Sequence, residues 1–431
     1  MRLRTRITLI TFGVLIFVIF APAIVLFATG FRYDFENNRL LKTGTIAIRT
    51  EPRQAEISIN GEKQPNGTPF AKRFLLPGEY TIEISKPGYR SWKKKITVLE
   101  ERVSFLPSNG REKIFLFEST LIQTTLATNT SDFIEKDSSI YFVNKNDIFQ
   151  SRETGKLPTL LATATVGLGN PKILDIDLTV ENNPSFLVKD SAKNYYIKGK
   201  QTIELDPALK SPRFNGQSNI LAINGQNQLV EFEPSESARI IAQNVLAFLN
   251  TDNIYYLSKN NSANLQLWIM SSNGTPTLLR DNLPNAQTAE MIVSETNQIL
   301  LLLDADLYLI SDNLKKLNGG TVYAYWDKSA DRLVYGNEHE IWIYQPTQDA
   351  NGYLVTRAAK NLGIPAYNHE TGYVFVAEEN ELKAIEYDVS GQPNIYSFDE
   401  TENPISKLVI NPAGTHLIYL DGTNLFSLKI R

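Results

Sequence analysis

Histidine, the side chain most used for acid–base catalysis and metal binding, occurs only three times in this 431-residue sequence. His339, His369 and His416 lie far apart, each at or beside turn-forming residues. Glu338 and Glu340 flank the first of them and would supply further metal ligands, but no second histidine follows at helix or strand spacing. We therefore expect surface turns here rather than a metal or catalytic site.

Two pairs of aspartates stand two residues apart, Asp175 with Asp177 and Asp304 with Asp306. On a strand, both carboxylates of such a pair face the same side. A Ca²⁺ ion or a catalytic water would use that arrangement, but no Asp-x-Asp-x-Asp-Gly loop accompanies either pair. Solvated strand ends are the simpler interpretation.

Three strings contain the residue types of a serine acylation site: Ser91-Trp-Lys-Lys94, Ser311-Asp-Asn313 and Lys42-Thr-Gly44. They match the motifs of penicillin-binding proteins, but in the wrong order, and Ser91 falls in a region without a predicted helix. Gly-x-Ser-x-Gly, a phosphate loop and His-Glu-x-x-His do not occur. We predict no catalytic, cofactor-binding or metal-binding residues, no cofactor, and no enzymatic activity.

One cluster of basic residues does suggest binding. It interleaves with Tyr89 and Trp92 and consists of Lys86, Arg90, Lys93, Lys94 and Lys95. On a strand starting near Ser91, Lys93 and Lys95 share one face, and Trp92 and Lys94 the other. The cluster is either a charged strand edge that blocks strand pairing, or a patch for anionic lipid or an anionic wall polymer, joined by Lys72 and Arg73.

Residues 7–29 form a stretch of 23 residues without a charge. This stretch determines where the rest of the chain lies relative to a membrane. As a helix it would reach about 34 Å, enough to cross a hydrocarbon core of about 30 Å. We predict an uncleaved transmembrane anchor, with a cleaved secretory signal as the alternative. Arg2, Arg4 and Arg6 form the tighter basic flank, which places residues 1–6 in the cytoplasm and the rest outside the cell membrane.

Charge is distributed unevenly along the chain. The net charge is +4 over residues 1–43, +5 over residues 44–98 and −13 over residues 99–431. An acidic distal region is not expected to bind nucleic acid or lie on an anionic bilayer. Because the sequence has no cysteine, an exported protein of this size points to a bacterial source.

Residues 44–98 follow a polar linker, residues 30–43, and alternate apolar and polar side chains between turn signals. Asn60-Gly61 is a strong hairpin signal, so a small antiparallel β-sandwich is predicted. Its motifs are Pro52-Arg-Gln-Ala55, Ile59-Asn-Gly61, Gly67-Thr-Pro69, Leu76-Pro-Gly-Glu-Tyr80 and Lys86-Pro-Gly-Tyr89. In this order they resemble the PEGA domain, which implies a prokaryotic surface protein and no catalysis.

Residues 113–431, after a second linker at residues 99–112, contain short strands that recur about every 40 residues, which is typical of a β-propeller. We predict about eight blades, with seven as the alternative and stacked β-sandwiches as the competing fold. The turn Asn411-Pro-Ala-Gly-Thr-His-Leu-Ile-Tyr419 resembles the repeats of TolB-type and Trp-Asp-type propellers. Lys113-Ile-Phe-Leu-Phe117 is predicted to complete the last blade.

The predicted fold class is therefore all-β: a transmembrane helix, a PEGA-type β-sandwich as spacer, and a β-propeller. The predicted function is that of a membrane-anchored, extracytoplasmic binding or scaffold protein of a prokaryotic cell envelope, with a protein or a cell-wall polymer as ligand. A propeller hydrolase or lyase acting on a wall polymer is the alternative. A transmembrane sensor is a third interpretation, but six cytoplasmic residues leave no output domain.

Overall fold

The computed structural model describes residues 3–35, 37–107, 113–152, 155, 157–180, 183–216, 218–260, 262–271, 274–294, 296–327, 331–346, 352–388 and 392–431, with backbone only for residues 3–9, 399 and 400. Arg2 and the side chains of Arg4 and Arg6, which carry the predicted orientation, lie outside this description, as do parts of both predicted linkers. The chain divides into two compact units: residues 1–120 with 386–395, and residues 121–385 with 396–431.

The first unit begins with the helix α1 (Leu3–Ala28), which continues through Pro22. Within the described part of the chain, residues 10–28 of α1 form one segment long and apolar enough to span a membrane, and none of it is buried. Two side chains satisfy carbonyl groups at its C-terminal end. The Thr29 hydroxyl donates to the Val25 carbonyl at 2.8 Å, and Arg32 Nη1 donates to the Phe27 carbonyl at 2.8 Å.

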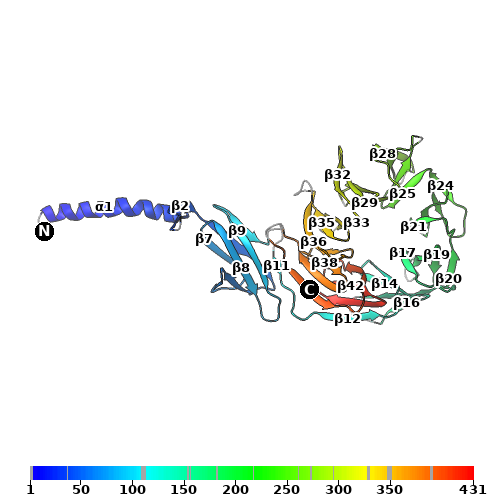
Figure 1. The fold of residues 1–431 in the computed structure, drawn as a ribbon, viewed down its shortest axis with the longest axis horizontal. Helices are drawn as coiled ribbons and strands as arrows, with labels where there is room; N and C mark the ends of the chain where they lie inside the picture. Colours follow the sequence, from blue (N-terminus) through cyan, green and yellow to red (C-terminus); the bar gives the residue numbers. More distant parts are fainter. Residues whose placement is uncertain are drawn as a thin grey trace. The chain divides into compact units, whose positions relative to one another are not determined.

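The predicted polar linker after α1 is instead folded. Strands β1 (Phe31–Asp34) and β2 (Arg39–Lys42) pair as an antiparallel hairpin beside the end of α1 (Figure 1). The Gly30 carbonyl accepts hydrogen bonds from both the backbone and the hydroxyl of Thr43, which close the base of the hairpin. The predicted linker at residues 30–43 therefore contains two paired strands.

The domain that follows the hairpin is a β-sandwich. One sheet has the order β10-β3-β7 and the other β6-β5-β8-β9, with β11 paired to β4. The strands are β3 (Gly44–Ile48), β4 (Thr50–Glu51), β5 (Glu56–Ile59), β6 (Glu62–Lys63), β7 (Phe70–Leu75), β8 (Gly78–Ser85), β9 (Trp92–Val98), β10 (Val103–Leu106) and β11 (Ile114–Phe115).

The alternating apolar positions of this domain form its core, as predicted. Ile46, Ile48, Ile57, Ile82 and Ile84 are at most 1 % exposed. The core extends beyond the predicted boundary at residue 98, because β10 and β11 run parallel to β3 and β4 and add buried apolar side chains. The domain is therefore not purely antiparallel, and the predicted linker at residues 99–112 contains a strand.

In the described part of the second unit, eight four-stranded antiparallel sheets follow one another (Figure 1). Their strands, in spatial succession, are β13 (Asp132–Lys136), β14 (Ser139–Asn144), β15 (Asp147–Ser151), β16 (Thr159–Thr163), β17 (Lys172–Asp177), β18 (Ser185–Asp190), β19 (Lys193–Lys198), β20 (Gln201–Glu204), β21 (Lys210–Phe214), β22 (Ile220–Ile223), β23 (Leu229–Phe232), β24 (Arg239–Ala242), β25 (Val245–Asn250), β26 (Ile254–Lys259), β27 (Leu265–Met270), β28 (Pro276–Leu283), β29 (Ala289–Val293), β30 (Ile299–Leu303), β31 (Asp306–Ile310), β32 (Leu314–Gly319), β33 (Tyr323–Asp327), β34 (Arg332–Gly336), β35 (Glu340–Tyr344), β36 (Tyr353–Arg357), β37 (Ala366–Asn368), β38 (Tyr373–Glu378), β39 (Glu381–Glu386), β40 (Ile395–Glu400), β41 (Ile405–Ile410), β42 (His416–Asp421), β43 (Asn424–Lys429) and β12 (Ile122–Ala127).

The last sheet combines the two ends of the second unit. Strand β12 pairs with β43, the final strand of the chain, and the buried Leu126 joins a core shared with Phe133 of the first sheet and Ile418 of the last. Closure by an early strand is thus present, but the prediction that Lys113–Phe117 provides it was wrong. Ile114 and Leu116 lie in the core of the first unit instead.

We expect Leu126→Ala to lower the free energy of unfolding of the second unit by about 2–5 kcal/mol, because it leaves a cavity in the closing core. Hydrogen exchange of peptides covering β42 and β43 should accelerate. Leu116→Ala is the matched control and should accelerate exchange in β3 and β9 only. Faster exchange of β42 and β43 in Leu116→Ala, but not in Leu126→Ala, would show that the predicted strand closes the sheet after all.

Candidate functional site

Strand β9, which carries most of the basic cluster, alternates strictly between buried and exposed residues. Trp92, Lys94 and Ile96 point inward, while Lys93 and Lys95 point to solvent. The predicted division of the lysines between the two faces agrees with this pattern. The pattern also means that one lysine of the cluster lies in the interior.

Lys94 is that lysine, and its side chain is fully buried. Its Nζ lies 2.7 Å from Asp388 Oδ2 and 3.3 Å from Glu386 Oε2. Both carboxylates come from residues 386–395, the segment that belongs to the first unit. Trp92 Nε1 donates to Glu386 Oε1 at 2.8 Å, and Asn394 Nδ2 donates to Glu386 Oε2 at 2.8 Å.

These five residues form what we call the Lys94 cluster: Trp92, Lys94, Glu386, Asp388 and Asn394. A buried charge is tolerated only when it is paired and hydrogen-bonded, and here one ammonium group faces two carboxylates. Lys94 therefore cannot contact a lipid or a polymer, and its assignment to the anionic-surface patch was wrong. Glu386 is 292 residues from Lys94 in the sequence, so no local sequence pattern reveals the pairing.

The exposed lysines of β9 have acidic partners on the neighbouring strand. Lys93 Nζ lies 3.6 Å from Glu83 and Lys95 Nζ lies 3.2 Å from Glu79, because the register of β8 and β9 sets these residues opposite or diagonal to each other. Exposed pairs of this kind contribute only about 0–1 kcal/mol to stability. They do, however, offset much of the positive charge on which the predicted patch depends.

The remaining basic residues are spread over the domain. Lys86 Nζ donates to the Arg53 carbonyl at 2.5 Å, and Arg90 is half-buried with its backbone N–H on the Phe117 carbonyl. Lys72, on the other sheet, donates to Gln64 Oε1 at 3.0 Å. The anionic-surface patch, reduced to Lys86, Arg90, Lys93 and Lys95, stays a prediction.

The aspartates of β17 connect neighbouring sheets. Asp175 Oδ2 accepts the backbone N–H of Phe214, and Asp177 Oδ2 accepts that of Ser218, both at 2.9 Å and both from the next sheet. In the first sheet, Asp132 Oδ2 accepts the N–H of Ile173, while its Oδ1 lies 2.9 Å from Lys407 Nζ of the last sheet. The first aspartate pair considered for calcium or water, Asp175 with Asp177, thus provides inter-sheet hydrogen-bond acceptors.

Burial acts to raise the pKa of Asp177, but the hydrogen bonds from Thr179 and Ser218 outweigh it and hold that pKa below its usual value. In the second pair, the backbone N–H groups of Thr288 and Gln287 hold the pKa of Asp304 below its usual value. Asp306 pairs with Lys316 at 2.7 Å. Asp177 and Asp304 therefore act in the folded state as charged acceptors.

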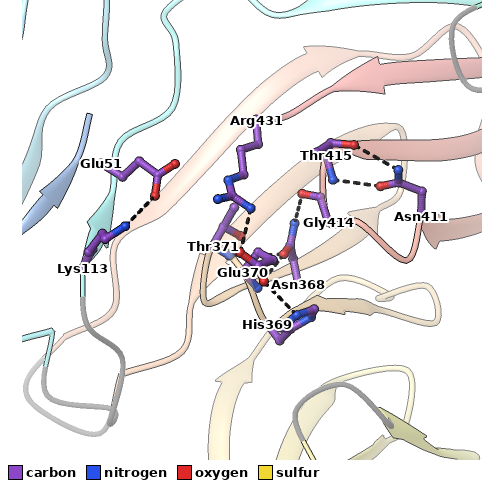
Figure 2. Close-up of polar contacts among 10 residues, drawn as sticks. All are labelled: Glu51, Lys113, Asn368, His369, Glu370, Thr371, Asn411, Gly414, Thr415 and Arg431. Carbon is purple, nitrogen blue, oxygen red and sulfur yellow. Dashed lines mark hydrogen bonds and ion pairs between the residues drawn. The ribbon is translucent and has the colours of Figure 1, made fainter. Parts of the chain in front are cut away.

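His369 lies in the turn between β37 and β38, which is hydrogen-bonded to the turn before β42 in the neighbouring sheet (Figure 2). Asn368 Oδ1 accepts the N–H of Glu370 at 3.0 Å, and its Nδ2 donates to the Gly414 carbonyl at 2.9 Å. Glu370 lies 3.1 Å from His369 Nε2 and 2.7 Å from Arg431 Nη1, so this carboxylate is already paired.

His416 begins β42, and its Nδ1 lies 3.0 Å from the Thr415 hydroxyl. His339 lies in the turn before β35, and the neighbouring Glu340 binds Arg357 at 2.7 Å. Across the residues that the structure describes, no three histidine, aspartate or glutamate side chains gather as a metal site requires.

One surface feature was not predicted. The outer side of the β10-β3-β7 sheet carries a groove of about 450 Å³ lined by the apolar Ala47, Phe70, Phe105 and Leu106, among others. Phe105 is 64 % exposed at this groove. Sequence patterns missed it because the lining comes from three strands, one of which lies in the predicted linker.

Removing Asp177 tests its role between sheets. Asp177→Asn should lower the free energy of unfolding at neutral pH by about 1.5–3 kcal/mol, because the hydrogen bonds lose their charged acceptor. Because folding lowers the pKa of Asp177, its carboxylate stabilises the fold at pH values above the pKa of the unfolded chain. This stabilisation is lost as the pH falls through the pKa of the folded chain. The difference from wild type should therefore disappear in strong acid. A constant difference at all pH values, or an equal effect of the exposed Asp137→Asn, would contradict this.

Lys94→Ala should destabilise the first unit by about 3–5 kcal/mol, because it leaves two buried carboxylates without a cation. The matched control, Lys93→Ala on the exposed face, should cost at most about 1 kcal/mol. Denaturant unfolding monitored by hydrogen exchange in β8 and β9 measures both. Similar effects for the two variants would argue against a buried ion pair.

Comparison with known proteins confirms both resemblances. Residues 43–106 match the PEGA domain, which covers the sandwich and includes β10. No curated protein sequence matches the chain.

Several solved β-propellers have a similar fold. The C-terminal WD40 domain of Sif2 superposes with a TM-score of 0.51 at 12 % identity, over 72 % of this chain and 99 % of that domain. A streptogramin B lyase gives a TM-score of 0.41 at 10 % identity, over 72 % and 98 % of the two chains. The Dos1 propeller gives 0.49 at 7 %, over 71 % and 93 %. Fold alone leaves the activity open. The chain thus combines an N-terminal apolar helix, a PEGA domain and a β-propeller.

Proposed function

We propose that this chain is a membrane-anchored, extracytoplasmic binding or scaffold protein of a prokaryotic cell envelope. Residues 10–28 form the membrane span, the PEGA domain is the spacer, and the β-propeller presents the surface for a protein or wall-polymer ligand. The observation that carries the proposal is the apolar segment of α1, which is 19 residues long, unburied, and followed directly by all-β units.

The side chains that could perform chemistry support binding over catalysis. Asp132, Asp175 and Asp177 are hydrogen-bonded across neighbouring sheets, and Glu370 is paired with His369 and Arg431. Groups used in this way hold the fold together and are not poised to transfer protons. A hydrolase or lyase for a wall polymer is the rival function.

The test is expression in a bacterial host, followed by membrane fractionation. The intact chain should remain in the pellet after carbonate washing and should keep its original N-terminus by mass spectrometry. Protease added to spheroplasts should digest the β-rich units. A soluble product that begins near Phe31 would show a cleaved signal instead of an anchor. Full protection from protease would reverse the topology.

The purified chain should not cleave peptidoglycan or other wall polymers. Turnover that a single carboxylate substitution abolishes would favour the rival enzyme.

A further inference from the structure

The hairpin β1–β2 presents apolar side chains to solvent at the end of α1. Phe35 is 83 % exposed, Tyr33 46 % and Leu40 45 %. The rings of Tyr33 and Phe35 contact each other edge to face, with centroids 5.1 Å apart. Large apolar side chains gathered on a surface indicate a partner, and aromatic side chains are enriched at the membrane interface.

The hairpin is held to the end of α1. Arg32 Nη1 donates to the carbonyls of Phe27 and Phe31 at 2.8 and 2.7 Å, so one guanidinium bridges the last turn of the helix and the first strand. The same guanidinium lies 3.5 Å from the ring centroid of Phe27 and 4.5 Å from that of Phe74, a 51 % exposed residue of the PEGA domain. The hairpin therefore remains where α1 ends.

That position determines its surroundings if α1 spans a bilayer. The headgroup layer adds about 5–8 Å on each side of the hydrocarbon core. A strand of four residues is about 13 Å long, so a hairpin at the helix end lies in or directly over this layer. Arg39, with a 61 % exposed side chain, stands on the same hairpin, where cationic groups meet lipid phosphates, and its Nε also lies 3.6 Å from Asp34.

We propose that the strands of this hairpin, residues 31–34 and 39–42, together with Phe35, form an interfacial anchor that lies in the lipid headgroup layer, with Tyr33, Phe35 and Leu40 against the lipid. The proposal rests on the membrane span of the proposed function. It adds a second contact with the bilayer, which fixes the height and orientation of the PEGA domain above it. A second copy of the chain or another protein covering the hairpin is the competing explanation.

Because the sequence has no cysteine, one introduced cysteine labels a single position. The probe is the environment-sensitive dye NBD, attached in the full-length chain reconstituted in anionic vesicles. Nitroxide lipids, labelled either at the headgroup or deep in the acyl chain, act as quenchers. Labels are placed at the hairpin turn (Asn37→Cys), within α1 (Ile19→Cys), and at the remote hairpin of the PEGA domain (Asn60→Cys).

Headgroup nitroxide should quench the Asn37 label and leave the Asn60 label bright, while acyl-chain nitroxide should quench the Ile19 label. Replacing Tyr33, Phe35 and Leu40 together by Ser should abolish quenching at Asn37. The matched replacement of exposed Ile240, Leu278 and Leu279 by Ser should leave it unchanged.

A quenched Ile19 label with an unquenched Asn37 label would overturn the interfacial anchor and leave the membrane span intact. An Asn37 label that is blue-shifted but unquenched would show that protein covers the hairpin, and would equally overturn the proposal. An unquenched Ile19 label would remove both the span and the interfacial anchor.

Discussion

The structure of the first unit depends on one buried charge, the ammonium group of Lys94, whose carboxylate partners are distant in sequence. Lys94 points into the interior because it shares a face of β9 with Trp92, and an unpaired ammonium group there would cost several kcal/mol. Glu386 and Asp388 compensate it. Trp92 donates to Oε1 of Glu386, and Asn394 donates to Oε2, the oxygen that also faces Lys94. Residues 386–395, which connect β39 to β40 and include one end residue of each strand, are therefore grouped with the first unit.

Long-range polar contacts have a similar role in the β-propeller. Seven of the eight described sheets are built from consecutive strands, but Asp132 of the first sheet accepts a hydrogen bond from the second and pairs with Lys407 of the last. Strand β12 then completes the last sheet. Asp175 and Asp177 accept hydrogen bonds from the next sheet in the same way. The proposed binding role directs the search for ligands to surfaces: the PEGA groove lined by Phe105, and the hairpin next to α1.

Local patterns predicted what is local. Each correct prediction rests on a pattern within a short stretch of sequence. These patterns are the uncharged stretch at residues 7–29, the alternating isoleucines of the PEGA domain and the recurring strands of the propeller. Strand β12 escaped prediction because it is a mostly unburied edge strand, half of whose residues are polar, while Lys113–Phe117 is mainly apolar and was chosen in its place. The partners of Lys94 and the parallel pairing of β10 depend on residues distant in sequence. Without a fold, nothing in the chain identifies them.

The most direct measurement of the Lys94 cluster is the rate at which an amine-specific acylating reagent modifies three consecutive lysines of the native chain, followed by mass spectrometry. Lys93 and Lys95, with side chains 64 % and 68 % exposed, should react readily. Lys94, with none of its side chain exposed, should stay unmodified until the first unit unfolds. Equal rates at all three positions in the folded chain would contradict the account.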